Sequence, residues 1–201
     1  MALTLNGSTN TITGLAVGGL PDGIVDTDML ANNAVTVAKA SGSAKGITMA
    51  DQWRISSNYE FPDTSSHDIT ANWERNDSTG FGNIGTGMTE SSGIFTFPQT
   101  GIYWIRLFAT TLSSTGSTTA VTAYIYAQKN SGSWASKAQG SEAGHTTNAY
   151  GAISLDFIFD VEDVSGDKVK MVAQSNNADR KILASSTAQR TGFTFIRLGD
   201  T

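Results

Sequence analysis

The residues that could act as acids, bases or nucleophiles do not form a recognisable catalytic pattern. The two histidines, His67 and His145, lie in the polar stretches Thr-Ser-Ser-His-Asp and Glu-Ala-Gly-His-Thr. Neither stands beside a Gly-x-Ser-x-Gly elbow or a zinc-binding pair of histidines. Spacing leaves a Ser-His-Asp site open, because such residues meet in space and not in sequence. Nothing favours one, and both histidines are best interpreted as surface residues.

Carboxylate pairs suggest a second chemistry, the hydrolysis of glycosides by two flanking acids. The candidate pairs are Asp26/Asp28, Asp156/Asp160 and Glu162/Asp163. Acids two or four positions apart on a strand more often line the solvent side of a sheet. The segment 163–167 could offer oxygen ligands to calcium, but its acids lack a regular ligand spacing. We therefore predict a protein that is not an enzyme and has no metal or cofactor.

Composition narrows the partners. The chain has 13 basic and 18 acidic residues, a net charge of −5, and its basic residues do not cluster, which argues against nucleic acid. The sequence has neither an apolar run long enough to span a membrane nor a signal-peptide pattern, so we expect synthesis in a cytoplasm and no membrane insertion. The absence of cysteine excludes disulfide bonds and thiolate chemistry.

The distribution of aromatic residues divides the chain. All 4 Trp, 5 Tyr and 9 Phe residues lie at or after Trp53. Because aromatic side chains dominate cores and interfaces, the part before Trp53 cannot build an ordinary core alone. The sequence predicts a leader at 1–46, which attaches to something else, and a compact all-β module at 47–201.

The leader contains two short β-prone runs, 3–9 and 10–15, with an Asn-Gly turn signal, which predicts a hairpin. A short helix is expected from Asp26 or Asp28 to about Ala40, with a narrow apolar stripe suited to contact with copies of itself. The residues expected to mediate assembly of the leader are Leu15, Leu20, Leu30 and Val37.

The module alternates strand and turn signals. Expected strands are 93–98, 102–109, 121–127, 154–160, 168–173 and 191–198, and 153–174 is predicted to form a hairpin. Long polar loops are expected at 76–92, 112–119 and 130–150. Because loops on a rigid sandwich often carry recognition, the candidates for receptor contact are Trp134, His145 and Tyr150, although Trp134 could equally cover a sheet edge.

Two of these strands are apolar on both sides. The run 102–109 is apolar except for Arg106, and 191–198 sets Phe193 and Phe195 against Ile196 and Leu198. Such runs are expected where both faces of a strand are buried, and a second subunit is the natural cover. The predicted interface residues are Tyr103, Ile105, Leu107, Phe193 and Phe195.

The module resembles the C1q/TNF-like jelly roll over roughly 52–199. The resemblance rests on Gly93-x-Phe95-x-x-Pro98-x-x-Gly101-x-Tyr103, on Gly166-Asp167-x-Val169, and on the aromatic last strand ending at Leu198. The glycine of that last strand, Gly192, is shifted from the usual pattern, and no collagen-like stalk is present. The resemblance implies a two-sheet antiparallel sandwich that forms a homotrimer, with 102–109 and 191–198 in the sheet facing the threefold axis.

The leader resembles a different group. Asn10-Thr-Ile-Thr-Gly-Leu and the segment 19–39 are similar to segments common in tail-fibre and other appendage proteins of tailed bacteriophages, including those of cyanobacteria. The two resemblances together imply a structural virion protein, anchored to other virion proteins by its leader, whose knob contacts a glycan or protein on the host surface. Two alternatives stay open: a head-decoration or adaptor protein of the virion, and a secreted or cell-surface C1q-like carbohydrate binder.

Overall fold

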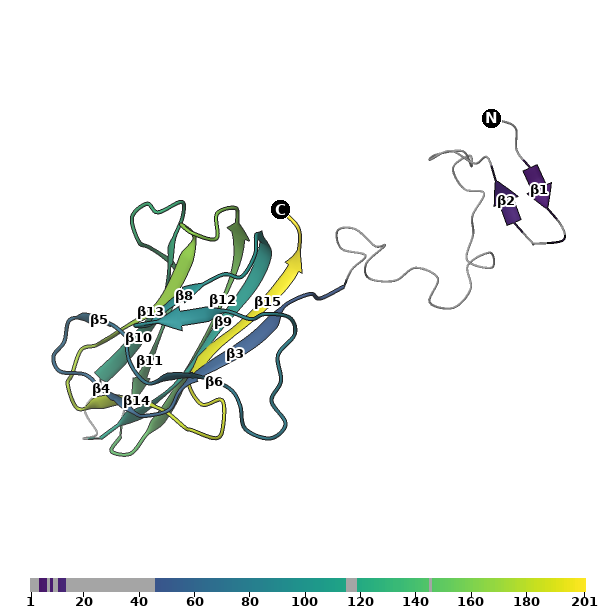
Figure 1. The fold of residues 1–201 in the computed structure, drawn as a ribbon. Helices are drawn as coiled ribbons and strands as arrows, with labels where there is room; N and C mark the ends of the chain where they lie inside the picture. The colour runs from purple at the N-terminus through teal and green to yellow at the C-terminus, as the bar shows by residue number, and fades with distance from the viewer. Residues whose placement is uncertain (1–3, 7, 9–10, 14–45, 115–118, 145) are drawn as a thin grey trace. The chain divides into compact units, whose positions relative to one another are not determined.

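The computed structural model describes residues 4–6, 8, 11–13, 46–114, 119–144 and 146–201 (Figure 1). The chain divides into two units, Met1–Ser41 and Gly42–Thr201. The predicted helix and the assembly candidates Leu15, Leu20, Leu30 and Val37 lie outside the described residues. In the described part, no helix is long and apolar enough to cross a membrane.

The predicted hairpin of the leader is confirmed. Strands β1 (Thr4–Asn6) and β2 (Thr11–Thr13) pair antiparallel, with Leu5 opposite Ile12. A lone two-stranded hairpin is marginally stable in water.

The module is all-β in its described residues and consists of two antiparallel sheets (Figure 1). The first, here called the β9 sheet, centres on β9 (Gly101–Ser113), which pairs with β12 (Tyr150–Val161) along one edge and with β15 and β14 along the other. Its remaining strands are β3 (Ala50–Ile55), β4 (Tyr59–Glu60), β6 (Trp73–Arg75), β14 (Arg180–Leu183) and β15 (Gly192–Gly199).

The second sheet, here called the β10 sheet, has the order β11-β10-β13-β8-β7, and β5 also pairs with β13. Its strands are β5 (Ser66–Asp68), β7 (Thr89–Ser91), β8 (Ile94–Thr96), β10 (Thr119–Gln128), β11 (Ala135–Gly144) and β13 (Lys168–Ser175). The strand predicted for 121–127 and the alternation predicted for 154–160 are both present, with Leu155 buried and Asp156 exposed.

The core lies between the two sheets and is rich in aromatic rings. Phe95 of the β10 sheet contacts the rings of Trp53, Trp73, Phe193 and Phe195 of the β9 sheet, at centroid distances between 5.0 and 5.6 Å. Phe95, Phe193 and Phe195 have no exposed surface. The aromatic residues therefore join the two layers, as their restriction to the module requires.

Two predictions about connectivity are wrong. The segment 153–174 is not a hairpin, because β12 pairs with β9 in one sheet whereas β13 pairs with β10 in the other. About half of the segment 130–150 is strand and not loop, because β11 occupies Ala135–Gly144. A Cβ atom at Gly140 would lie 2.9 Å from Cδ2 of Leu155, so the glycine lets β11 pass closely over β12.

Candidate functional site

The outer face of the β9 sheet carries three of the five large exposed apolar side chains found among the described residues. On β9 the odd-numbered side chains point into the core and the even-numbered ones point outward. The predicted interface residues Tyr103, Ile105, Leu107, Phe193 and Phe195 all have no exposed surface. They pack in the core of their own chain and cannot contact a second folded chain, which corrects the prediction. The outward set on the same strands takes their place.

The exposed apolar side chains of the described residues gather on this sheet. Five large apolar residues are exposed, namely Ile47 (52%), Ile84 (47%), Tyr150 (67%), Ile158 (62%) and Leu198 (47%). Tyr150 and Ile158 lie on β12, Leu198 lies on β15, and Ile84 forms a bridge with Ala50 of β3. Ile47 precedes β3 by three residues. Because exposed apolar patches mark interaction surfaces, the outer face of the β9 sheet is the candidate site.

The strand register arranges this face in rows. Ile158 of β12 lies opposite Trp104 of β9, which lies opposite Ile196 of β15, which in turn lies opposite Ala50 of β3. These residues form an apolar row across four strands. Trp104 and Ile196 are half-buried in the single chain, so both retain surface for a contact.

The next row is polar. Asp156 of β12 lies opposite Arg106 of β9, which lies opposite Thr194 of β15 and then Gln52 of β3. Gln52 Nε2 donates to Thr194 Oγ1 at 3.1 Å, and Arg106 Nε donates to Ser154 Oγ at 3.2 Å. The guanidinium of Arg106 also lies 6.0 Å from the centroid of the Phe108 ring.

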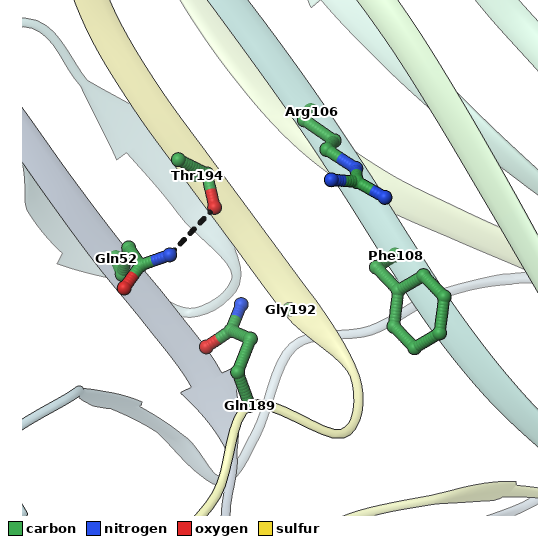
Figure 2. Close-up of a pocket in the computed structure, with 6 residues that line it drawn as sticks. All are labelled: Gln52, Arg106, Phe108, Gln189, Gly192 and Thr194. Carbon is green, nitrogen blue, oxygen red and sulfur yellow. Dashed lines mark hydrogen bonds between the residues drawn. The ribbon is translucent and has the colours of Figure 1, made fainter.

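A hollow of about 250 Å³ opens beside this polar row (Figure 2). Its lining residues are Gln52, Arg106, Phe108, Gln189, Gly192 and Thr194. Gly192 lies opposite Phe108 and has no side chain to fill the space. An added Cβ atom at Gly192 would lie 1.9 Å from the carbonyl oxygen of Trp53, so only glycine permits the observed approach of β15 to β3.

Gln189 is held in place at the edge of the hollow. Its Nε2 atom lies 3.2 Å from the carbonyl oxygen of Trp53 and 3.4 Å from that of Phe193, and its Oε1 atom accepts a hydrogen bond from Asn76. The amide of Gln189 therefore already has partners, as does that of Gln52. Arg106 is the charged group that the hollow presents.

The residues considered for catalysis do not form a site in the described structure. His67 Nε2 lies 2.8 Å from Asp63 Oδ1, and no serine hydroxyl is bonded to the ring among the described residues. Hydrogen bonds from Ser65 N–H, and then from His67, hold the pKa of Asp63 below its usual value. Within the described ranges, no three His, Asp or Glu side chains gather where they could hold a metal ion.

The receptor candidates are separated. Trp134 is half-buried and lies beside Lys170 of the β10 sheet, whose Nζ atom is 4.6 Å from its ring centroid. Tyr150 is a strand residue on the outer edge of the β9 sheet, with the Arg190 guanidinium 5.8 Å from its ring. His145 lies outside the described residues. Trp134 and Tyr150 therefore belong to different surfaces.

Comparison with known proteins identifies the fold. No protein-family model matches the chain, and no curated protein matches it by sequence. Among solved structures it is similar to the Eiger TNF of S. frugiperda, with 12% identity and a TM-score of 0.56 over 76% of this chain and 94% of that one.

Two crystal structures of murine APRIL are similar as well. The structure at pH 8.5 has 14% identity and a TM-score of 0.53, and the one at pH 8.0 has 15% identity and a TM-score of 0.52. Each covers 74% of this chain and 98% of the murine chain. At these identities the similarity shows the fold alone. The module is a TNF-like jelly roll, which confirms the predicted fold class.

Proposed function

We propose that this protein is a non-enzymatic structural component of a tailed-bacteriophage virion, in which three copies of the jelly roll form a knob and the leader attaches the knob to the particle. The observation that carries the proposal is the concentration of exposed apolar side chains on the β9 sheet. A chain that worked alone would leave side chains such as Ile158, 62% exposed, in water. Complete burial of such a side chain contributes on the order of 1–3 kcal/mol.

The row arrangement supports assembly around an axis that runs along β9. Rotation about an axis does not change a residue's height along that axis. Copies arranged in this way therefore bring the apolar row of Ile158, Trp104 and Ile196 against the same row of the next copy. The threefold order follows from the resemblance of the module to C1q/TNF-like proteins.

The leader supplies the attachment. It lacks aromatic residues, its described hairpin is too small to be stable alone, and its sequence is similar to segments of phage appendage proteins. The host-facing surface is the outer face of the β10 sheet, which carries Trp134 beside Lys170 and stays free when the β9 sheets meet. An aromatic ring among polar side chains can stack on a sugar or anchor a protein.

Native mass spectrometry of the full-length chain tests the assembly. The expected result is the mass of three chains, and a wild-type chain that is only monomeric would contradict the proposal. Ile196→Glu, on the outer face of β15, is expected to give monomers. Ile94→Glu is the matched control, because Ile94 is also a half-buried isoleucine and lies on the outer face of the β10 sheet.

Antibody labelling of purified phage particles tests the location. Label on the tail or baseplate supports an appendage, and label on the capsid would identify a head-decoration protein instead. Absence of the chain from purified particles would contradict any virion role and favour a secreted or cell-surface binder. Saturable binding of the trimer to host cells, reduced in Trp134→Ala, would support a role in attachment.

A further inference from the structure

We propose that the hollow beside Arg106 receives the carboxylate of Asp156 from a neighbouring copy, so that every contact in the assembly contains one Arg106–Asp156 ion pair. This inference rests on the proposed self-association of the β9 sheet and names the residue pair that sets its register. Figure 2 shows the Arg106 side chain at the edge of the hollow, near Phe108 and Thr194.

The guanidinium of Arg106 has unused donors. Within the described structure its only hydrogen bond is from Nε to Ser154 Oγ, which leaves both terminal nitrogens available. The other arginines of the β9 sheet are already paired: Arg54 with Glu74 and Asp77, Arg75 with Asp51, Arg180 with Glu142, and Arg197 with Asp200. A guanidinium with two free terminal nitrogens is suited to bind a carboxylate through two parallel hydrogen bonds.

Assembly makes a partner for Arg106 necessary. The residue lies between the apolar row of Trp104 and the ring of Phe108, so a contact that covers these side chains also covers the guanidinium. A buried charge without a partner is strongly destabilising. Ser154 supplies one neutral acceptor, and Asp156 of the same chain, although it lies opposite Arg106, makes no ion pair with it in the described structure, so we assign the charged acceptor to the second copy.

Asp156 is the acid that fits. The outer face of β12 carries two acids, Asp156 and Asp160, and no ion pair within the described structure includes either carboxylate. Asp156 lies in the same row as Arg106, whereas Asp160 lies opposite Ile102, two rows away. With the axis along β9, rotation keeps Asp156 at the height of Arg106, while Asp160 meets the row of Ile102.

The two charged residues of the proposed pair lie on different strands, so the contact between two copies is not symmetric. Asp156 is on the edge strand β12 and Arg106 is on the central strand β9. The edge of one copy therefore lies over the middle of the next. A head-to-tail contact of this kind closes into a ring when the rotation between copies divides a full turn evenly. In such a ring, each copy places its Asp156 against one neighbour and receives the Asp156 of the other neighbour at its Arg106.

Charge exchange in the full-length chain tests the pair, with native mass spectrometry as the readout. Arg106→Glu and Asp156→Arg are each expected to lose the trimer at a concentration where the wild type is fully assembled. The double variant R106E/D156R restores the opposite charges and is expected to recover it. A mixture of the two single variants is also expected to recover trimers in part, because exchanged charges on different chains can meet in a pair between copies but not in a pair within one chain. R106E/D160R is the matched control and is expected to stay monomeric. Arg106 and Asp156 are exposed in the single chain, so we expect the substitutions to leave the fold intact. Circular dichroism checks that each variant folds.

The outcomes separate this pair from the self-association on which it rests. A trimer that survives Arg106→Glu would overturn the pair and leave self-association standing. The same conclusion would follow if R106E/D156R stayed monomeric while Arg106→Met, which removes the charge without replacing it, still assembled. A wild-type chain that is monomeric would overturn both. If the trimer recovered in R106E/D160R as well as in R106E/D156R, the overall charge of the outer face of the β9 sheet, and not a specific pair, would decide assembly. This result would also overturn the assignment to Asp156.

Discussion

The carboxylate of Asp167 binds the ammonium group of Lys129 at 3.1 Å, at the corner where the chain leaves β12 and enters β13. Asp167 has no exposed surface, and its two oxygens also accept the backbone N–H groups of Asn130, Glu162 and Asp163 at 2.6 to 3.1 Å. One side chain therefore joins the turn after β10 to the corner that passes between the two sheets. Asp167 belongs to the segment 163–167 that was considered above for calcium binding. Its hydrogen bonds and its ion pair with Lys129 instead give it a structural role.

Replacing this carboxylate is expected to destabilise the module. Asp167→Asn removes the charge and turns an amide NH₂ group toward backbone N–H donors, so the expected loss is about 2–3 kcal/mol in the free energy of unfolding. Urea denaturation measures it. Asp160→Asn is the control, because its exposed carboxylate has no bond in the described structure, and we expect a change below about 0.5 kcal/mol. Equal stability of the two variants would contradict the role of Asp167.

The same residue predicts a dependence of stability on pH. Burial by itself would raise the pKa of Asp167, but the N–H groups of Asn130, Asp163 and Glu162 and the Lys129 ammonium outweigh it and hold the pKa below its usual value. A group with a lowered pKa in the folded state stabilises fully above its unfolded pKa of about 4 and loses this contribution as the pH falls. The wild type and Asp167→Asn should therefore differ most near neutral pH and converge between about pH 4 and pH 2. A constant difference in urea denaturation across this range would contradict the assignment.

Local patterns allowed several elements to be predicted from the sequence. The leader hairpin follows from two β-prone runs around an Asn-Gly turn, and β12 follows from the alternation of Leu155, Phe157 and Phe159 with acids. Both signals lie within a few residues, where side-chain period and turn chemistry decide the conformation.

The orientation of β9 could not be predicted in the same way. When both sets of alternating side chains are apolar, alternation does not tell which set faces the core. From the apolar run alone, Tyr103, Ile105 and Leu107 are predicted to lie at the interface, whereas in the structure Trp104 and Phe108 point outward. The available signal was Arg106, the one charged residue of the run, because a charge is rarely placed in a core. Its parity identifies the even-numbered set as the outer one.

Long-range topology could not be predicted either. The residues of β11 are small or polar and show no apolar alternation, and most of their side chains are exposed. Their strand conformation comes from pairing with β10 and from the close crossing at Gly140, which are tertiary contacts. Likewise, adjacency in sequence predicted a β12–β13 hairpin, although the two strands belong to different sheets.

A buried ion pair between the two sheets gives a further prediction. Arg180 of β14 pairs with Glu142 of β11, and their side chains are 1% and 13% exposed. Burial lowers the pKa of Arg180, and its Nε and Nη1 atoms have no partner in the described structure. Glu142→Gln leaves this cation without its counter-charge, and the expected loss is about 3–5 kcal/mol in the free energy of unfolding.

Two further variants make that prediction specific. Arg180→Met combined with Glu142→Met removes both charges and is expected to recover most of the loss in urea denaturation. Glu60→Gln breaks the exposed pair with Lys181, in which Glu60 is 67% exposed, and is expected to cost less than about 1 kcal/mol. A double variant as unstable as Glu142→Gln would mean that packing, and not charge, explains the effect.

The close approach of β15 to β3 requires glycine at position 192. A methyl group there would lie 1.9 Å from the carbonyl oxygen of Trp53 and 2.8 Å from Cα of Arg54, both of which are backbone atoms that cannot rotate away. Gly192→Ala should therefore separate the two strands and lower the free energy of unfolding by about 1–3 kcal/mol, measured by urea denaturation. Gly199→Ala, at the other end of β15, is the matched control, because no atom lies within 4 Å of its added Cβ. Since Gly192 lines the hollow beside Arg106, Gly192→Ala should also weaken the trimer in native mass spectrometry. If Gly192→Ala and Gly199→Ala had the same free energy of unfolding and the same trimer content, neither strand pairing nor assembly would depend on Gly192.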